Sequence, residues 1–240
     1  MGVPNQLARD PSGALGGARR RLRDRLTPDR DPSLPRLNIR RLLLIRHGST
    51  DAVRRAAFPL DEPLDELARV ALASLDRRLG GEALTSPALR ARETAAALGL
   101  EASPEQMLRE CDFGAWAGRT LAGIADESPG EAHEWMLDPR ARPHGGETLT
   151  ELLSRVGSWL ERQRRLDGRA IAVTHGGVIK AAVVHVLRAP PAAFWRIDVK
   201  PLSVTELHAS EAAWTLTRSN ATLAEATPAP VADRGEVGVR

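Results

Sequence analysis

Two short runs of apolar residues interrupt an otherwise mixed pattern of hydrophobic and polar positions. The first is Leu42–Ile45, and the second lies within Arg169–Thr174. Neither run contains a polar residue, and polar residues flank each run on both sides. This is typical of strands buried on both faces, as in a parallel sheet. The pattern therefore predicts two central strands.

Other segments show the apolar spacing of helices or the short extent of strands. Helices are predicted at 64–79, 88–98 (closed by Gly99), 148–160 (capped by Thr148) and 178–187, with one or two short ones within 120–138. Further strands are predicted at 82–85, 105–108, 203–208 and 214–217, and loops at 52–63 and 139–146. Strands that alternate with helices favour an α/β fold with a largely parallel sheet.

The 240 residues suit one domain with tails. We predict a disordered basic leader at 1–36, a folded domain at 37–220 and a disordered tail at 221–240. Residues 1–41 carry a net charge of +6, which leaves −3 on the remainder of a chain with net charge +3. Nucleic acid is therefore an unfavoured partner for the domain. The leader is either an arm for an acidic partner, a solvated arm, or the product of a start site assigned too early.

The sequence has no apolar run near membrane-span length and no apolar segment of a secretory signal after Met1. Cys111 is the only cysteine, and no Cys/His cluster has zinc spacing. We therefore expect a cytoplasmic protein that needs neither a membrane, a metal nor a cofactor.

Both predicted central strands end on a histidine followed by glycine, at His47-Gly48 and His175-Gly176. The carboxyl ends of parallel strands share one edge of a sheet, where α/β proteins bind ligands. Arg90 follows a third strand ending, and Glu110 a fourth. Arginine binds phosphate through paired hydrogen bonds, and an imidazole can attack phosphorus. These residue types at one edge indicate a site for an anionic, phosphorylated small molecule.

Five motifs carry a resemblance to a known family. They are R-H-G-S-T at 46–50, S-P-A-L-R-A-R-E-T-A at 86–95, L-R-E-C-D-F-G-A-W-A-G at 108–118, G-G-E-T at 145–148 and T-H-G-G at 174–177. In this order they resemble the histidine phosphatase superfamily, which includes the phosphoglycerate mutases. The resemblance covers about 41–220. It implies a three-layer α/β/α fold of the phosphoglycerate mutase type, with a mostly parallel central sheet.

The resemblance also implies roles for individual residues. His47 would be the nucleophile that forms a phosphohistidine, and Glu110 would serve as general acid and then as general base. Arg46, Arg90 and His175 would bind the phosphoryl oxygens. Thr50 would either donate to a phosphate oxygen or only cap a turn.

Three further residues are candidates on the leaving-group side. Arg54 and Arg55 would either meet a second anionic group or lie in solvent. His144 would either face the pocket or serve the loop that contains it.

The motifs are close together, with only 19 residues between Arg90 and Glu110. Because the mutases have long insertions between these motifs, the resemblance favours the phosphatase branch. We expect a metal-independent phosphomonoesterase for small phosphorylated metabolites, with α-ribazole phosphate as one candidate substrate. The alternatives are mutase-type phosphoryl transfer and a non-catalytic phosphate-binding module. A homodimer is compatible with the sequence.

Overall fold

A computed structural model describes residues 40–75 and 79–223 of the chain. The predicted leader at 1–36 lies outside these residues, as does all but the first three residues of the predicted tail. The tail prediction began at residue 221, whereas the last strand continues to Thr222, two residues beyond the predicted end of the domain.

Within the described residues, six strands form one sheet in the order β3-β2-β4-β1-β5-β6. Their bounds are β1 Arg40–Arg46, β2 Glu82–Thr85, β3 Ser103–Pro104, β4 Gly168–Thr174, β5 Ser203–Ala209 and β6 Trp214–Thr222. β1 pairs in parallel with β4, β4 with β2, and β2 with β3, while β5 runs antiparallel to both β1 and β6. The sheet is therefore mostly parallel, as expected.

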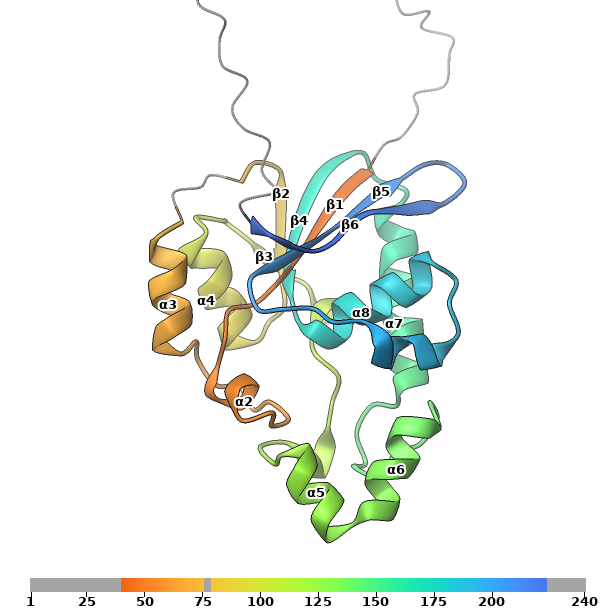
Figure 1. Ribbon diagram of the computed structural model, residues 1–240. Helices are drawn as coiled ribbons and strands as arrows, with labels where there is room; N and C mark the ends of the chain where they lie inside the picture. The colour runs from red at the N-terminus through yellow and green to blue at the C-terminus, as the bar shows by residue number, and fades with distance from the viewer. Residues whose placement is uncertain (1–39, 76–78, 224–240) are drawn as a thin grey trace, which may run out of the picture. The chain divides into compact units, whose positions relative to one another are not determined.

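Alternating residues of the central strands enter two different hydrophobic clusters. Leu42 and Leu44 of β1 pack with α7 (Leu149–Gln163) and α8 (Gly176–Val186). Leu43 and Ile45 pack with α3 (Glu66–Ala73) and α4 (Leu89–Ala97) on the opposite face. Because successive strand residues point to opposite faces, β1 is buried on both sides. Helices cover each face of the sheet, which gives the expected three layers (Figure 1).

The remaining elements are short. They are α2 Asp51–Arg54, α5 Leu121–Glu127, α6 Pro129–Leu137 and the 3₁₀ helices η1 Gln106–Leu108, η2 Gly114–Trp116 and η3 Pro191–Arg196. Two predictions were wrong here. The segment predicted as a strand at 105–108 is mainly η1, because the Glu105 side chain accepts a bond from the Met107 N–H and starts a helical turn. The segment predicted as a loop from 52 contains most of α2, which Thr50 caps.

An aromatic cluster packs α5 and α6 against the loop before α3. Phe58, Trp116 and Ile124 form its buried centre, and Phe113 and Trp135 pack against it. This cluster is separate from the two clusters on the sheet, so the segment forms a small cap beyond the carboxyl ends of the strands (Figure 1). None of the described helices has the length and hydropathy needed to cross a membrane.

Candidate active site

The ends of β1 and β4 bring the two predicted histidines together. Arg46 pairs with Thr174 in the parallel register, and the His47 N–H donates to the Thr174 carbonyl at 2.9 Å. The next residue on β4 is His175. The imidazoles of His47 and His175 therefore lie side by side, with ring centroids 5.1 Å apart, and both are buried.

Arg90 joins the two imidazoles. It lies in the first turn of α4, after β2, and is 3% exposed. Its Nε donates to His47 Nε2 at 3.2 Å, and its second terminal nitrogen lies 3.2 Å from His175 Nδ1. Its other terminal nitrogen donates to the Leu60 carbonyl at 2.7 Å, which fixes the guanidinium. We call His47, Arg90 and His175 the imidazole–arginine cluster.

The hydrogen bonds of His47 assign its tautomer. Nδ1 lies 2.6 Å from the Gly48 carbonyl, which can only accept, so the proton resides on Nδ1. Nε2 then presents a lone pair. Burial, and after it the positive charge of Arg90, lowers the pKa of His47 to about 3. The imidazole is thus neutral at physiological pH, and its Nε2 is unprotonated and accepts from Arg90, which is the form that can act as a nucleophile.

His175 is held by Ser86, the residue that follows β2. Because Arg90 can only donate, Nδ1 of His175 is the acceptor, and the proton lies on Nε2. Nε2 donates to Ser86 Oγ at 2.7 Å. Burial, followed by the nearby His47, lowers the pKa of His175 well below its usual value. This histidine is therefore also neutral.

Arg46 and Glu110 line a cavity of about 230 Å³ at the same strand ends. The residues relevant here are Arg46, Glu110, Trp135, Gly177, Lys180 and Trp195. The Glu110 carboxylate accepts from the backbone N–H groups of Cys111 at 3.0 Å and Gly177 at 3.2 Å. Arg46 donates to the Val199 carbonyl at 2.6 Å, while its buried Nε has no hydrogen-bond partner among the described residues. We call this space the Glu110 cavity.

Glu110 owes its place to Gly177, because a Cβ there would lie 2.3 Å from Oε1 of Glu110. Only glycine lets the carboxylate approach this closely to the start of α8. Two other motif glycines allow a similar approach between loops. A Cβ at Gly114 would lie 2.1 Å from the His144 carbonyl oxygen, and one at Gly146 would lie 2.1 Å from that of Asp112.

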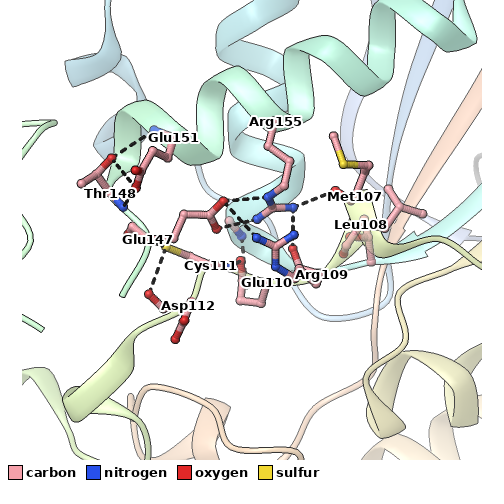
Figure 2. A network of polar contacts seen from close by, with 12 residues as sticks. Met107, Leu108, Arg109, Glu110, Cys111, Asp112, Glu147, Thr148, Glu151 and Arg155 are labelled. Atoms are coloured by element: carbon pink, nitrogen blue, oxygen red, sulfur yellow. Dashed lines mark hydrogen bonds and ion pairs between the residues drawn. The ribbon is translucent and has the colours of Figure 1, made fainter. Parts of the chain in front are cut away.

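A buried ion pair supports the segment that carries Glu110 (Figure 2). Arg155 of α7 binds both carboxylate oxygens of Glu147 at 2.7 and 2.6 Å. Its remaining terminal nitrogen donates to the carbonyls of Met107 at 2.7 Å and Arg109 at 3.0 Å. Arg155 thereby ties the backbone on the N-terminal side of Glu110 to α7.

Comparison with known proteins agrees with this geometry. Residues 42–222 match the model of the histidine phosphatase superfamily (branch 1). The chain belongs to the histidine phosphatase superfamily. Its cluster of two histidines and an arginine at the strand ends thus occurs in a phosphoglycerate mutase-like fold, as the motifs led us to expect.

Three similar proteins illustrate the likeness. A bifunctional protein of Mycobacterium tuberculosis (strain ATCC 25618 / H37Rv) is 33% identical over 189 residues, 72% of this chain, but the chain spans only about half (51%) of that protein. A mycobacterial glucosyl-3-phosphoglycerate phosphatase structure has a TM-score of 0.65 and 30% identity, covering 77% of this chain and all of that one. The Shigella flexneri α-ribazole phosphatase structure (TM-score 0.66, 24% identity, 76% and 98% coverage) shares the fold.

The other candidate residues lie outside the imidazole–arginine cluster. Thr50 caps α2 by accepting from the Val53 N–H, and its hydroxyl lies 3.0 Å from a Glu62 carboxylate oxygen that its proton can reach. The structure thus shows the capping role, and phosphate binding by Thr50 stays a prediction. His144 is buried among the rings of Phe113, Trp116 and Trp135.

The two candidate arginines after the first strand are half-exposed and already paired. Arg54 contacts the carboxylates of Asp51 and Asp65 at 3.5 Å each, and Arg55 contacts Asp51 at 2.8 Å. Of their two predicted environments, the structure therefore shows a largely solvated one. Contact with a second anionic group of a substrate stays a prediction for both.

Sequence reasoning missed three contributors. Ser86 belongs to the motif at 86–95, and its position directly after a strand was the signal that could have identified it. The ion pair between Glu147 and Arg155 could not be recognised in the sequence. Glu147 precedes α7 and Arg155 lies within it, so the two residues do not have the spacing of a pair on one helix. Lys180 lines the Glu110 cavity, and its position in the sequence gave no signal of this.

Proposed function

We propose that this chain is a metal-independent phosphomonoesterase that acts through a phosphohistidine on His47. In the first step, the Nε2 lone pair of His47 attacks phosphorus, and the bond to the leaving-group oxygen breaks. The Glu110 carboxyl gives its proton to that oxygen. In the second step, water gives a proton to the Glu110 carboxylate and attacks phosphorus. The N–P bond then breaks to release inorganic phosphate and neutral His47.

The observation that carries this proposal is the contact of one guanidinium with two neutral imidazoles. Arg90 touches the Nε2 of His47 that would attack, so a phosphoryl group on that nitrogen would lie against the guanidinium. A phosphate monoester carries about two negative charges near neutral pH. Arg46 and Arg90 supply two positive charges, and fixed donors of this kind stabilise the charge of the transferring phosphoryl group.

The size of the Glu110 cavity supports a small leaving group. Its volume of about 230 Å³ lies below the roughly 300–1,000 Å³ of typical ligand pockets. The mycobacterial relative named glucosyl-3-phosphoglycerate phosphatase also supports small phosphorylated metabolites as substrates. α-Ribazole phosphate remains one candidate, since the likeness to the Shigella phosphatase concerns the fold alone. A cytoplasmic location, a homodimer and an acidic partner for the leader remain predictions.

The first experiment is hydrolysis of phenyl phosphate in the presence of EDTA. We expect turnover by the wild-type chain, none above background by His47→Ala, and wild-type turnover by His133→Ala, whose histidine is exposed on α6. Rapid acid-free quenching followed by mass spectrometry should find the phosphoryl group on the peptide that contains His47. Unchanged turnover in His47→Ala would refute the mechanism.

The two alternative functions give different results in the same preparation. A mutase would isomerise 3-phosphoglycerate, primed with a bisphosphate, faster than it releases inorganic phosphate. A binding module would bind phosphate without turning over any ester. The short α5 and α6 segments of the cap favour water as the acceptor, because retention of a bound intermediate requires a more extensive cover.

A further inference from the structure

Lys180 lies on the wall of the Glu110 cavity, one helical turn beyond the glycine pair that follows His175. Residues three and four apart share a face of a helix, so Lys180 lies on the face that begins with Gly176 and Gly177. Neither glycine has a side chain to cover that face. The Lys180 ammonium therefore belongs to the same cavity as the Glu110 carboxylate.

This ammonium is half-buried and lacks an acidic partner. Among the described residues it forms no hydrogen bond and no ion pair, and its Nζ lies 5.4 Å from the ring centroid of Phe194. Glu110 and Asp198 act to raise its pKa, but both are beyond ion-pair distance. Burial, the largest effect, lowers the pKa of Lys180, as does the charge of Arg46. A half-buried cation that no carboxylate contacts directly is stabilised by a ligand that supplies such a contact.

The substrate phosphate does not account for this charge. Arg46 and Arg90, the latter with Glu62 at 4.0 Å, face the roughly two negative charges of a phosphomonoester. Lys180 is a third cation, and its backbone lies about one helical pitch, roughly 5 Å, along α8 from Gly176 and Gly177. The other candidates for a second anionic group, Arg54 and Arg55, are paired with aspartates.

We propose that Lys180 binds a second anionic group on the leaving-group side of the substrate. The inference rests on the proposed phosphomonoesterase function and narrows its substrate class. The preferred substrate is the phosphate ester of a short alcohol that carries a carboxylate or a second phosphate a few bonds away. Trp135 and Trp195, whose ring centroids are 4.7 Å apart, supply an apolar wall for the carbon atoms between the two charges.

Two matched substrate pairs test this inference. 3-Phosphoglycerate and glycerol 3-phosphate differ only in a carboxylate against a hydroxymethyl group. Propane-1,3-diol bisphosphate and its monophosphate differ only in the second phosphate. For each pair, the measured quantity is the ratio of kcat/KM for the anionic member to kcat/KM for the other member.

We expect Lys180→Met to lower this ratio about tenfold for at least one pair, the size of one charge-assisted hydrogen bond in a partly solvated site. Lys180→Arg should restore most of the ratio. Lys200→Met is the matched control, because Lys200 is the other lysine of the chain and is exposed. This variant should leave the ratio at its wild-type value. The pair that responds identifies the second anionic group.

Failure of this inference differs from failure of the proposed function. If the wild type hydrolyses all four esters and Lys180→Met leaves both ratios unchanged, Lys180 does not bind the second group, while the phosphatase function stands. If no ester is hydrolysed, the proposed function fails. Calorimetry then measures the affinity of the same four compounds for the wild type and for Lys180→Met. If Lys180→Met loses affinity equally for both members of each pair, the inference that Lys180 binds the second anionic group is overturned.

Discussion

Replacement of Arg155 by methionine should both destabilise the fold and impair Glu110. The change leaves the Glu147 carboxylate, 8% exposed, without its bidentate partner, and the carbonyls of Met107 and Arg109 without a donor. Removal of one member of a buried ion pair generally costs about 3–5 kcal/mol because the other charge stays buried. Because Arg109, half-exposed and 3.6 Å from Glu147, still offsets part of that charge, we expect the free energy of unfolding of Arg155→Met to fall by about 3 kcal/mol, the lower end of this range.

Urea unfolding of a two-mutant cycle measures the effect. Arg155→Met combined with Glu147→Gln removes both charges, so the double variant should be less destabilised than the sum of the two single variants, by about 0.5–3 kcal/mol. The exposed pair Arg142–Glu151 provides the matched control. Arg142→Met should cost less than about 1 kcal/mol, as surface pairs do.

Kinetic measurements separate the effect of Arg155 on the position of Glu110 from its effect on the stability of the fold. Arg155 binds the Arg109 carbonyl, one residue before Glu110, and reaches the imidazole–arginine cluster only through its charge, which helps to lower the pKa of His175. Under folding conditions, Arg155→Met should therefore lower kcat for an alkyl phosphate about tenfold or more and change KM little. The loss should be smaller for p-nitrophenyl phosphate, whose leaving group needs less help from an acid. A destabilisation below about 1 kcal/mol, or equal kcat losses for both esters, would refute the reasoning.

Two further predictions concern Gly177 and the neutral histidines. Gly177→Ala should displace the Glu110 carboxylate and lower kcat for alkyl phosphates at least tenfold, whereas Gly130→Ala, whose Cβ meets nothing within 4 Å, should not; equal rates would contradict the crowding at Gly177. Because the folded pKa values of His47 and His175 lie below 6.5, the unfolded chain takes up more protons as the pH falls from about 6.5 to 4.5. Stability in urea should then drop by up to about 1.4 kcal/mol per pH unit for each histidine. His47→Gln should reduce the slope by up to this amount and leave the shares of His175 and of His144, whose pKa burial also lowers.

The sequence was most informative where burial and chemistry change at the same residue. At Ile45–Arg46 and at Thr174–His175, a run of apolar residues ends on charged or titratable ones. This change is local, so it can be recognised without tertiary information. The parallel register of β1 and β4 then places His47 beside His175, as the two strand endings had predicted.

Features that depend on contacts between distant segments could not be predicted. The apolar content of 105–108 suits a short strand as well as a 3₁₀ turn, and the Glu105 side-chain bond decides between them. Arg155 resembles a polar residue on the outer face of an amphipathic helix, yet it is buried because Glu147 and two carbonyls receive it. Only the folded structure shows that these three groups surround Arg155.

The burial that keeps the two histidines neutral also concentrates positive charge around them. Arg90 is buried because the Leu60 carbonyl and the two imidazoles accept its hydrogen bonds, and none of these acceptors carries a negative charge. A carboxylate in their place would satisfy the guanidinium and raise the pKa of the nearby His47, which would protonate the nucleophile. The Glu62 carboxylate does pair with Arg90 at 4.0 Å, but through the terminal nitrogen that donates to the Leu60 carbonyl, so the two nitrogens that face the imidazoles keep neutral acceptors. The same reasoning extends to Lys180, whose only close partner in the described chain is the face of an aromatic ring.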